Sequence, residues 1–265
     1  MSVRNQGAGP ERSITYKQPD HPVTKADRLS HEYISLRLKD LTPLIPVISE
    51  ESDVHMLPDS CRQFWLVDPM DGTKEFIKGS DEFTVNIALV QDGTPVLGII
   101  DVPAFQETYF GGQSIDFSVI RYSQLREIPP ALLPSATEAI PPPYVLSLSR
   151  SHRNTDDETF LSLIAQEMDI IQDYCGSSLK FCRVAEGRSH FYARMGPTME
   201  WDTAAGHAIV TSAGGRVVDW NLKPLAYGKP GFRNPGLIAM NRRGLGHEEI
   251  WKKLARSFHR TDSPA

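Results

Sequence analysis

The sequence predicts a mixed α/β fold of the α+β class, and three observations lead to this prediction. Apolar side chains over residues 25–41 recur at helical spacing. From there to about residue 128, short apolar strands and a hairpin around the turn Asp92–Gly93 indicate an antiparallel sheet. Beyond residue 144, strands and helices alternate. The chain has 265 residues, enough to bury the core of one large domain or two small ones.

The first half of the chain, residues 21–128, begins with the expected helix. Thr24 is a suitable N-cap, and the carboxylate of Asp27, three residues later, lies near the exposed backbone N–H groups of the first turn. Strands are then expected at residues 45–49, 64–67, 83–90, 95–102, 108–110 and 117–120. The first two of these strands run directly into carboxylates, which makes their ends the first candidates for a site.

The remaining segments differ in composition. Residues 1–20 have no helical or strand period and are expected to be a loose N-terminal arm. Residues 129–143 contain six prolines and are expected to be an exposed linker or surface loop. The second half, residues 144–265, is expected to be α/β. Its strands are expected at 144–148, 170–174, 190–194 and 216–220, and its helices near 155–168, 177–186, 202–213 and 248–258.

Composition and charge exclude several classes of protein. No apolar run approaches the roughly 18 residues of a membrane-spanning helix, and the start has no signal-peptide stretch. The three cysteines form no CxxC pair, which argues against a disulfide framework or a zinc site. A formal net charge of −5 does not attract a nucleic acid polymer. We therefore expect a cytoplasmic monomer or homodimer, at most peripheral at the inner face of the cell membrane, that acts on a small molecule.

The most informative stretch is DPMDGT at residues 68–73. A strand that breaks at Pro69 projects Asp68 and Asp71 from one tight turn, together with the carbonyl of Met70 and the hydroxyl of Thr73. Such a set of hard oxygens suits Mg²⁺. A turn of this kind also serves simply to end a strand. A calcium-binding EF-hand loop and the DxDGT nucleophile of another phosphatase class are excluded, because the spacing of the acids differs.

Two further acidic elements are weak when taken singly. Glu50 and Glu51 follow a buried strand, where adjacent acids are most often solvated. Asp202 precedes a helix rich in small residues, where an aspartate is most often a plain N-cap. The small residues 204–206 would allow the backbone to approach a bound group, and a helix N-terminus favours phosphate. These two acidic elements indicate a functional site only when they are considered together with residues 68–73.

In this order, SEE at 49–51, DPMDGT at 68–73 and WDTAAG at 201–206 resemble the signature of the lithium-sensitive, magnesium-dependent phosphatases of the inositol monophosphatase superfamily. The chain is most similar to the 3'(2'),5'-bisphosphate nucleotidases of the bacterial CysQ type. The shared segments are HPVTKAD at 21–27, DGTKEFIK at 71–78, EFTVNIAL at 82–89, SRSH at 149–152, GSSLKFC at 176–182 and WDTAAGHA at 201–208. This resemblance implies one layered αβαβα sandwich of the sugar-phosphatase type, with a metal-binding half over 21–128 and a specificity half over 144–265.

The resemblance also implies roles for individual residues. Two or three Mg²⁺ ions would be held by Glu50, Asp68, the carbonyl of Met70, Asp71 and Asp202. Asp27 and Thr73 would activate the attacking water, and Glu50 would orient it. Substrate contacts would come from Glu50, Met70, Asp71, Gly72, Thr73, Ser149, His152, Ser177, Lys180, Arg194 and Asp202. For Ser177 and Lys180 we expect places in the first turn of a helix, where free N–H groups meet a second phosphate.

The implied reaction is hydrolysis of the 3'-phosphate of adenosine 3',5'-bisphosphate (PAP) to AMP and phosphate, in sulfur assimilation and nucleotide recycling. The corresponding phosphosulfate (PAPS), cut to APS, is a second expected substrate. Two alternatives stay open: a phosphatase of inositol or sugar monophosphates, and a non-hydrolysing protein that binds nucleotide or metal. The last alternative arises because family members carry an amphipathic helix ahead of residues 21–27, and residues 1–20 show no such helical face.

Overall fold

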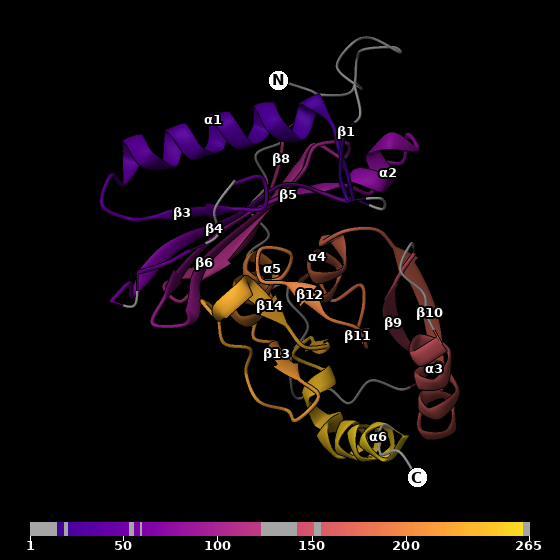
Figure 1. The fold of residues 1–265 in the computed structure, drawn as a ribbon. Coiled ribbons are helices and arrows are strands. Elements are labelled where there is room, and N and C mark those ends of the chain that lie inside the picture. The colour runs from indigo at the N-terminus through magenta and orange to yellow at the C-terminus, as the bar shows by residue number, and fades with distance from the viewer. Residues whose placement is uncertain are drawn as a thin grey trace.

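The structure is a computed structural model that describes residues 15–18, 21–52, 56–58, 60–122, 142–150 and 155–261. Its elements stack in five layers (Figure 1): an outer helix, a six-stranded sheet, a central pair of helices, a five-stranded sheet and a second outer pair of helices. The expected αβαβα sandwich is therefore confirmed.

The six-stranded sheet contains the first half of the chain, and its strand order follows the sequence. Its strands are β3 (Val47–Ser49), β4 (Gln63–Asp71), β5 (Thr84–Gln91), β6 (Thr94–Val102), β7 (Glu107–Gly112) and β8 (Ile115–Arg121). β3 is parallel to β4, and the other neighbours are antiparallel. Every strand expected in this half is present. The sheet is antiparallel apart from that first pair, as the hairpin pattern indicated.

Helix α1 (Lys25–Leu41) covers one face of this sheet (Figure 1). It begins at the N-cap Thr24, where the hydroxyl of Thr24 accepts from the N–H of Ala26 and Asp27 completes a capping box, as expected. Leu38 packs against Trp65 and Val67 of β4. The helix therefore places Asp27 above the end of β4, which carries the acidic turn.

The five-stranded sheet contains the second half and has the order β10–β9–β11–β15–β13. Its strands are β9 (Tyr144–Ser149), β10 (Ile170–Cys175), β11 (Phe191–Arg194), β13 (Arg216–Asp219) and β15 (Leu237–Met240). The sequence prediction missed β15, although it lies between β11 and β13. A run of four apolar residues is too short for periodicity to identify, and only pairing on both sides makes it a strand.

Helices α4 (Leu179–Ala185) and α5 (Ala204–Ser212) lie between the two sheets. A Cβ atom added at Gly206 would lie 2.2 Å from the ring of Phe181, and one added at Gly98 of β6 would lie 2.2 Å from the carbonyl oxygen of Ala205. The small residues of α5 thus serve close packing within the protein. The expectation that they also let the backbone approach a bound group stays a prediction.

The outer layer on the second sheet consists of α3 (Thr155–Glu167) and α6 (Glu248–Thr261). Phe160 of α3 stacks on Trp251 of α6 with ring centroids 6.2 Å apart, and both side chains are fully buried. The C-terminal helix, for which the sequence offered no role, therefore closes this part of the core.

Several short elements were not predicted. Within the expected loose arm, β1 (Thr15–Gln18) pairs antiparallel with β2 (His21–Val23), while residues 1–14 lie outside the described residues. Most of the expected linker, up to residue 141, also lies outside them. The other unpredicted elements are α2 (Thr73–Ile77), β12 (Thr198–Met199), β14 (Arg233–Asn234) and the 3₁₀ turns η3 (Pro230–Phe232) and η4 (Gly244–His247).

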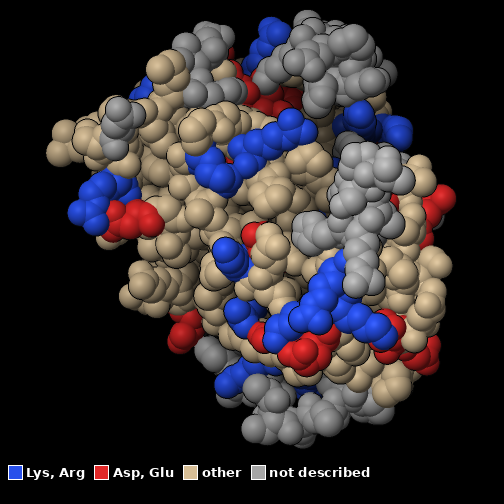
Figure 2. Space-filling model, turned by 60° about the horizontal axis from the view of Figure 1, so that its bottom comes forward, with Lys and Arg blue, Asp and Glu red and all other residues tan. Residues whose placement is uncertain are grey.

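Figure 2 shows basic and acidic side chains close together on one face, with uncharged areas between them. Ion pairs between exposed or half-exposed side chains include Arg216–Glu248 and Lys253–Glu167. Among the described residues, no helix combines the length and apolar character needed to cross a membrane.

Candidate active site

The acidic turn lies at a bulge at the end of β4. In the ladder with β5, Asp68 lies opposite Asn86 and Asp71 lies opposite Thr84, so β4 contains one extra residue between its two acids. The N–H of Met70 donates to Oδ1 of Asp68 over 2.9 Å, which turns the Asp68 carboxylate back onto its own strand. The bulge thus directs both carboxylates out of the regular sheet.

Gly72 follows the bulge with φ of 89° and begins α2. A Cβ atom there would lie 3.1 Å from the carbonyl oxygen of Glu82 and 3.2 Å from Cβ of Ser177. Both the backbone conformation and the space therefore require glycine. The absence of a side chain at Gly72 also allows the first half to pack closely against Ser177 of the second half.

Thr73 and Asp27 form the pair that was expected to act on water. Oγ1 of Thr73 lies 3.0 Å from Oδ1 of Asp27 and 3.1 Å from the carbonyl oxygen of Met70. Its single proton is donated preferentially to the charged acceptor, Asp27. Asp27 is 2% exposed, and its other oxygen accepts from the N–H of Thr24 over 2.8 Å. Asp27 is therefore both a helix-capping residue and the partner of Thr73.

One cavity of about 710 Å³ is lined by residues from both halves of the chain. All five predicted metal ligands line it: Glu50, Asp68, Met70, Asp71 and Asp202. Asp68 and Asp202 are about 130 residues apart in sequence, so only the stacking of the two sheets brings them into one cavity. Ser149, Gly72, Thr73, Ser177, Lys180 and Arg194 line the same cavity. Asp27 lies behind Thr73, outside the lining, and His152 lies outside the described residues.

The carboxylates of this cavity repel one another. Burial raises the pKa of Asp68 well above its usual value, and the nearby charge of Glu50 adds to the effect. Burial and the charge of Asp71 raise the pKa of Asp202 in the same way. Each shift means that the ionised carboxylate is disfavoured while no cation is present. A bound cation would reverse this effect by stabilising the charged forms.

Hydrogen bonds to neutral donors hold the carboxylates apart. Oδ2 of Asp71 accepts from the hydroxyl of Ser178 over 2.6 Å, and Oδ2 of Asp202 accepts from the N–H of Met199 over 2.9 Å. Within the described part of the chain, no three acidic, imidazole or thiol side chains converge into a ready-made metal centre. The ligands therefore share a cavity, but their oxygens must turn toward a common point for an ion to be bound.

The donor chemistry fits magnesium. The described lining of the cavity contains carboxylates, hydroxyls and the Met70 residue, and it contains no histidine or cysteine. A set restricted to oxygen donors suits Mg²⁺, whereas zinc and copper sites depend on imidazole or thiolate.

Lys180 and Ser177 lie on another wall of the cavity, in a geometry that differs from the expectation. Helix α4 has its N-cap at Ser178, so Ser177 precedes the helix and adopts a left-handed conformation with φ of 48°. The ammonium of Lys180, which is 4% exposed, donates to the carbonyl oxygens of Ser177 (2.5 Å) and Cys175 (3.3 Å). Burial lowers the pKa of Lys180. The hydroxyl of Ser177 is buried and has no partner among the described residues.

Three further cations line the cavity: Lys74 of α2, Arg194 at the end of β11 and Arg233 of β14. Across the described ranges, none of the three makes a side-chain hydrogen bond or ion pair with the protein. By contrast, Arg150, Arg183 and Arg121 lie outside this lining and are all paired with carboxylates. Unpaired cations beside a group of acids mark the cavity as a site for a ligand with several anionic groups.

Sequence reasoning missed several residues of the site. Lys74, Thr198, Arg233 and Ser178 line the cavity. The hydroxyl of Ser178 donates to Asp71, and Asn86 donates to Ser178 from further inside the protein. Nothing in the sequence pattern distinguishes Arg233 or Thr198 from surface residues. Asn86 does leave a signal, because it occupies an inward position of a strand in which alternate residues are buried.

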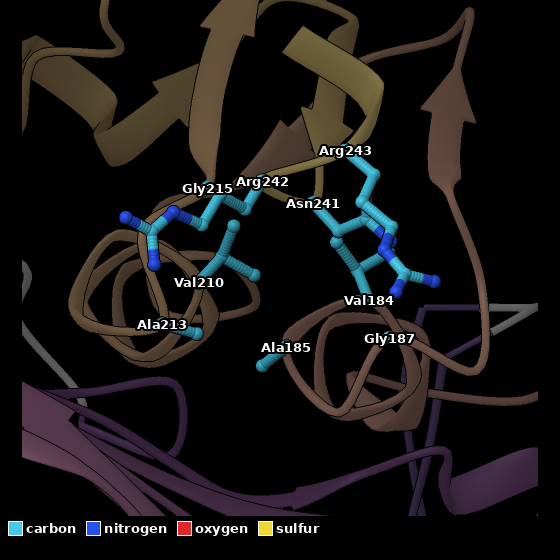
Figure 3. A pocket seen from close by; sticks show the side chains of 9 residues that line it. All are labelled: Val184, Ala185, Gly187, Val210, Ala213, Gly215, Asn241, Arg242 and Arg243. Atoms are coloured by element: carbon cyan, nitrogen blue, oxygen red, sulfur yellow. The ribbon is translucent and has the colours of Figure 1, made fainter. Parts of the chain in front are cut away.

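A second cavity lies apart from the acids (Figure 3). It has a volume of about 10 Å³ and is bounded by the C-terminal ends of α4 and α5 and by Asn241, Arg242 and Arg243. A space of this size holds about one water molecule. It therefore has no part in the binding of a nucleotide or sugar phosphate.

Comparison with known proteins agrees with the geometry. The sequence profile of the inositol monophosphatase family matches residues 1–260. The chain belongs to the inositol monophosphatase family. Members of this family depend on Mg²⁺, which agrees with the carboxylate and hydroxyl oxygens of the cavity and with the absence of histidine and cysteine from its described lining.

Within the inositol monophosphatase family, the chain is 44% identical over 227 residues to the 3'(2'),5'-bisphosphate nucleotidase CysQ of Salmonella typhimurium, covering 83% of this chain and 85% of the relative. The solved CysQ structure from Bacteroides thetaiotaomicron, at 37% identity, superposes with a TM-score of 0.72 over 82% of this chain and 83% of that chain. A structure described as IMPase/NADP phosphatase complexed with Mg²⁺ and phosphate superposes with a TM-score of 0.70 over 91% of this chain and 85% of that chain. At 18% identity it shows the fold alone.

Proposed function

We propose that this protein is a Mg²⁺-dependent 3'(2'),5'-bisphosphate nucleotidase that hydrolyses the 3'-phosphate of PAP to AMP and phosphate. The observation that carries the proposal is the single cavity of about 710 Å³, which combines the acid set with three cations that form no ion pair with a carboxylate of the described residues. A ligand of nucleotide size fits such a volume. The names of the CysQ relatives support the same substrate. We place the activity in sulfur assimilation and nucleotide recycling, with PAPS as a second substrate.

When bound, two or three Mg²⁺ ions would neutralise phosphate charge, lower the pKa of a bound water and assist the leaving oxygen. Glu50, Asp68, the carbonyl of Met70, Asp71 and Asp202 would hold them. The attacking water would give its proton toward Oγ1 of Thr73. The Thr73 hydroxyl donates its own proton in a hydrogen bond to Oδ1 of Asp27, with 3.0 Å between the two oxygens. Because Asp27 is buried and fixed by Thr24, this acceptor keeps its direction during the reaction.

The remaining substrate groups would be held by the basic wall of the cavity. Arg194 presents a planar guanidinium suited to a second phosphate, and the unpartnered hydroxyl of Ser177 offers a further hydrogen bond. Lys180 would act mainly through its charge, since two of its three N–H donors are already used by backbone carbonyls. Ser149, at the end of β9, lines the same wall. His152 is proposed as a substrate contact on the resemblance alone.

The compartment is a further part of the proposal. Cys61, Cys175 and Cys182 are all free thiols, and two of them are buried. Free thiols of this kind persist in reducing compartments. We therefore place the enzyme in the cytoplasm.

The first test is phosphate release from PAP, from inositol 1-phosphate and from a sugar monophosphate, each with Mg²⁺ and with EDTA. We expect the highest kcat/KM for PAP and no turnover in EDTA. A higher kcat/KM for a monophosphate would decide for the inositol or sugar phosphatase alternative. Calorimetric binding of PAP without turnover of any substrate would decide for a binding protein.

The second test uses Arg194→Gln, with Arg256→Gln on the exposed face of α6 as a matched control. Loss of one charge-assisted contact costs about 1.5–3 kcal/mol, so we expect kcat/KM for PAP to fall roughly 10- to 150-fold. Turnover of inositol 1-phosphate should be unchanged, because this substrate has no second phosphate. Equal losses on both substrates would contradict the assigned role of Arg194.

A further inference from the structure

A chain of buried hydrogen bonds runs from strand β5 to the acid set. The hydroxyl of Thr84 lies 3.0 Å from Oδ1 of Asn86, and Nδ2 of Asn86 lies 2.8 Å from Oγ of Ser178. Oγ of Ser178 in turn lies 2.6 Å from Oδ2 of Asp71. Thr84, Asn86 and Ser178 are each at most 2% exposed. None of the three was expected to belong to the site.

The direction of these hydrogen bonds is determined by which atoms can donate and which can only accept. A carbonyl oxygen cannot donate, so Oδ1 of Asn86 must accept the proton of Thr84, and its NH₂ group then faces Ser178. Because the Ser178 oxygen accepts from Asn86, its single proton is shared between Oδ2 of Asp71 and the backbone carbonyl oxygen of Asp202. The bond at the carboxylate end, 2.6 Å between Oγ of Ser178 and Oδ2 of Asp71, has the length of a charge-assisted hydrogen bond.

Ser178 also connects the two halves of the protein. Its oxygen lies 2.8 Å from the carbonyl oxygen of Asp202, and its backbone forms the N-cap of α4. Asp71 belongs to the first half, whereas Ser178 and Asp202 belong to the second. The position of the Asp71 carboxylate relative to Asp202 is therefore fixed through one hydroxyl group.

We propose that Ser178 is a positioning residue, itself oriented by Asn86. It fixes the position of the Asp71 carboxylate relative to Asp202 and so determines the affinity of the site for Mg²⁺. The inference rests on the proposed magnesium site. Residues that orient metal ligands in this way alter metal affinity by about 10- to 100-fold when they are removed. The side chain of Ser178 itself need not touch the ion or the substrate.

The decisive experiment is calorimetric titration of the full chain with Mg²⁺ alone, without substrate. Ser178→Ala should raise the Kd for Mg²⁺ about 10- to 100-fold. The matched control is Ser147→Ala, which removes an equally buried hydroxyl whose partners, Ser189 and Asp173, do not line the cavity. This control should leave the Kd for Mg²⁺ unchanged. Asn86→Ala should raise the Kd in the same direction but less, because the Ser178 hydroxyl is retained and has lost only its fixed orientation.

The possible outcomes are distinguishable. If the wild-type protein binds Mg²⁺ and Ser178→Ala binds it as tightly as Ser147→Ala does, the inference is overturned and the proposed function is untouched. If the wild-type protein shows no Mg²⁺ binding, both are overturned. Thermal unfolding in EDTA reports on folding. If Ser178→Ala does not fold, Asn86→Ala takes its place. An unchanged Kd for Mg²⁺ in a folded Asn86→Ala protein would equally refute the positioning role of these hydrogen bonds.

Discussion

Asp68 is the most deeply buried of the carboxylates that line the cavity, at 1% exposure. We expect Asp68→Asn to stabilise the metal-free protein while it abolishes activity. Burial and the neighbouring acids raise the pKa of Asp68, so its ionised form is unfavourable without a cation. Asparagine has the same shape, and its Oδ1 can still accept from the N–H of Met70, which is 2.9 Å from Oδ1 of Asp68 in the native turn. The change therefore removes charge and leaves the turn in place.

The sign of the pH dependence follows from the raised pKa. Between the ordinary pKa of an aspartate and the raised value, the folded state holds a proton that the unfolded chain has lost. The stability of the wild-type apo protein therefore falls as the pH rises through this range, by at most about 1.4 kcal/mol per pH unit for this group. Asp68→Asn has no ionisable group at this position, so its stability does not fall in this way as the pH rises. We expect its free energy of unfolding to exceed that of the wild type by about 1–2 kcal/mol at about pH 8, or roughly 2–8 °C in Tm.

The assay is thermal unfolding followed by circular dichroism, in EDTA, from about pH 8 to about pH 5. The stability difference should shrink as the pH falls, because the folded wild type then carries the proton. Asp116→Asn, on the exposed part of β8, is the matched control and should show no such trend. Added Mg²⁺ should reverse the order, since it stabilises only the protein that binds it. A variant less stable than the wild type at pH 8 in EDTA, or a difference independent of pH, would refute the reasoning.

Two further predictions concern the chemistry and the packing. Thr73→Val removes the hydroxyl that lies 3.0 Å from Asp27 and should lower kcat about 10²- to 10⁴-fold. Calorimetry should show its Mg²⁺ affinity within twofold of the wild type, and a loss of kcat under tenfold would contradict the proton-accepting role. Gly206→Ala would place a Cβ atom 2.2 Å from the ring of Phe181 and should lower the free energy of unfolding by about 1–3 kcal/mol in urea denaturation. Unchanged stability would show that α4 and α5 can separate without cost.

Sequence reasoning succeeded where a structural feature is local. The capping box at Thr24 and Asp27, the helix over 25–41 and the hairpin around Asp92–Gly93 depend on neighbouring residues, and all three are present. Strand β15 failed as a prediction because four apolar residues carry no readable period. Residues 204–206 show a different limit of sequence reasoning. Small side chains indicate close approach, but the sequence does not say whether the approaching group is a ligand or, as here, Phe181.

By itself the sequence determined which chemistry the protein has available: the order of the acidic motifs, their resemblance to one phosphatase family and the oxygen ligands they supply. The tertiary structure decided how these groups meet. The bond from Ser178 to Asp71 spans 107 positions of the chain. Only the tertiary structure shows that Lys74, Arg194 and Arg233 line the cavity without an ion-pair partner among the described residues. The physical reason is that propensity and periodicity depend on neighbours within a few residues. The distances between charges depend instead on how two sheets and the central helices pack.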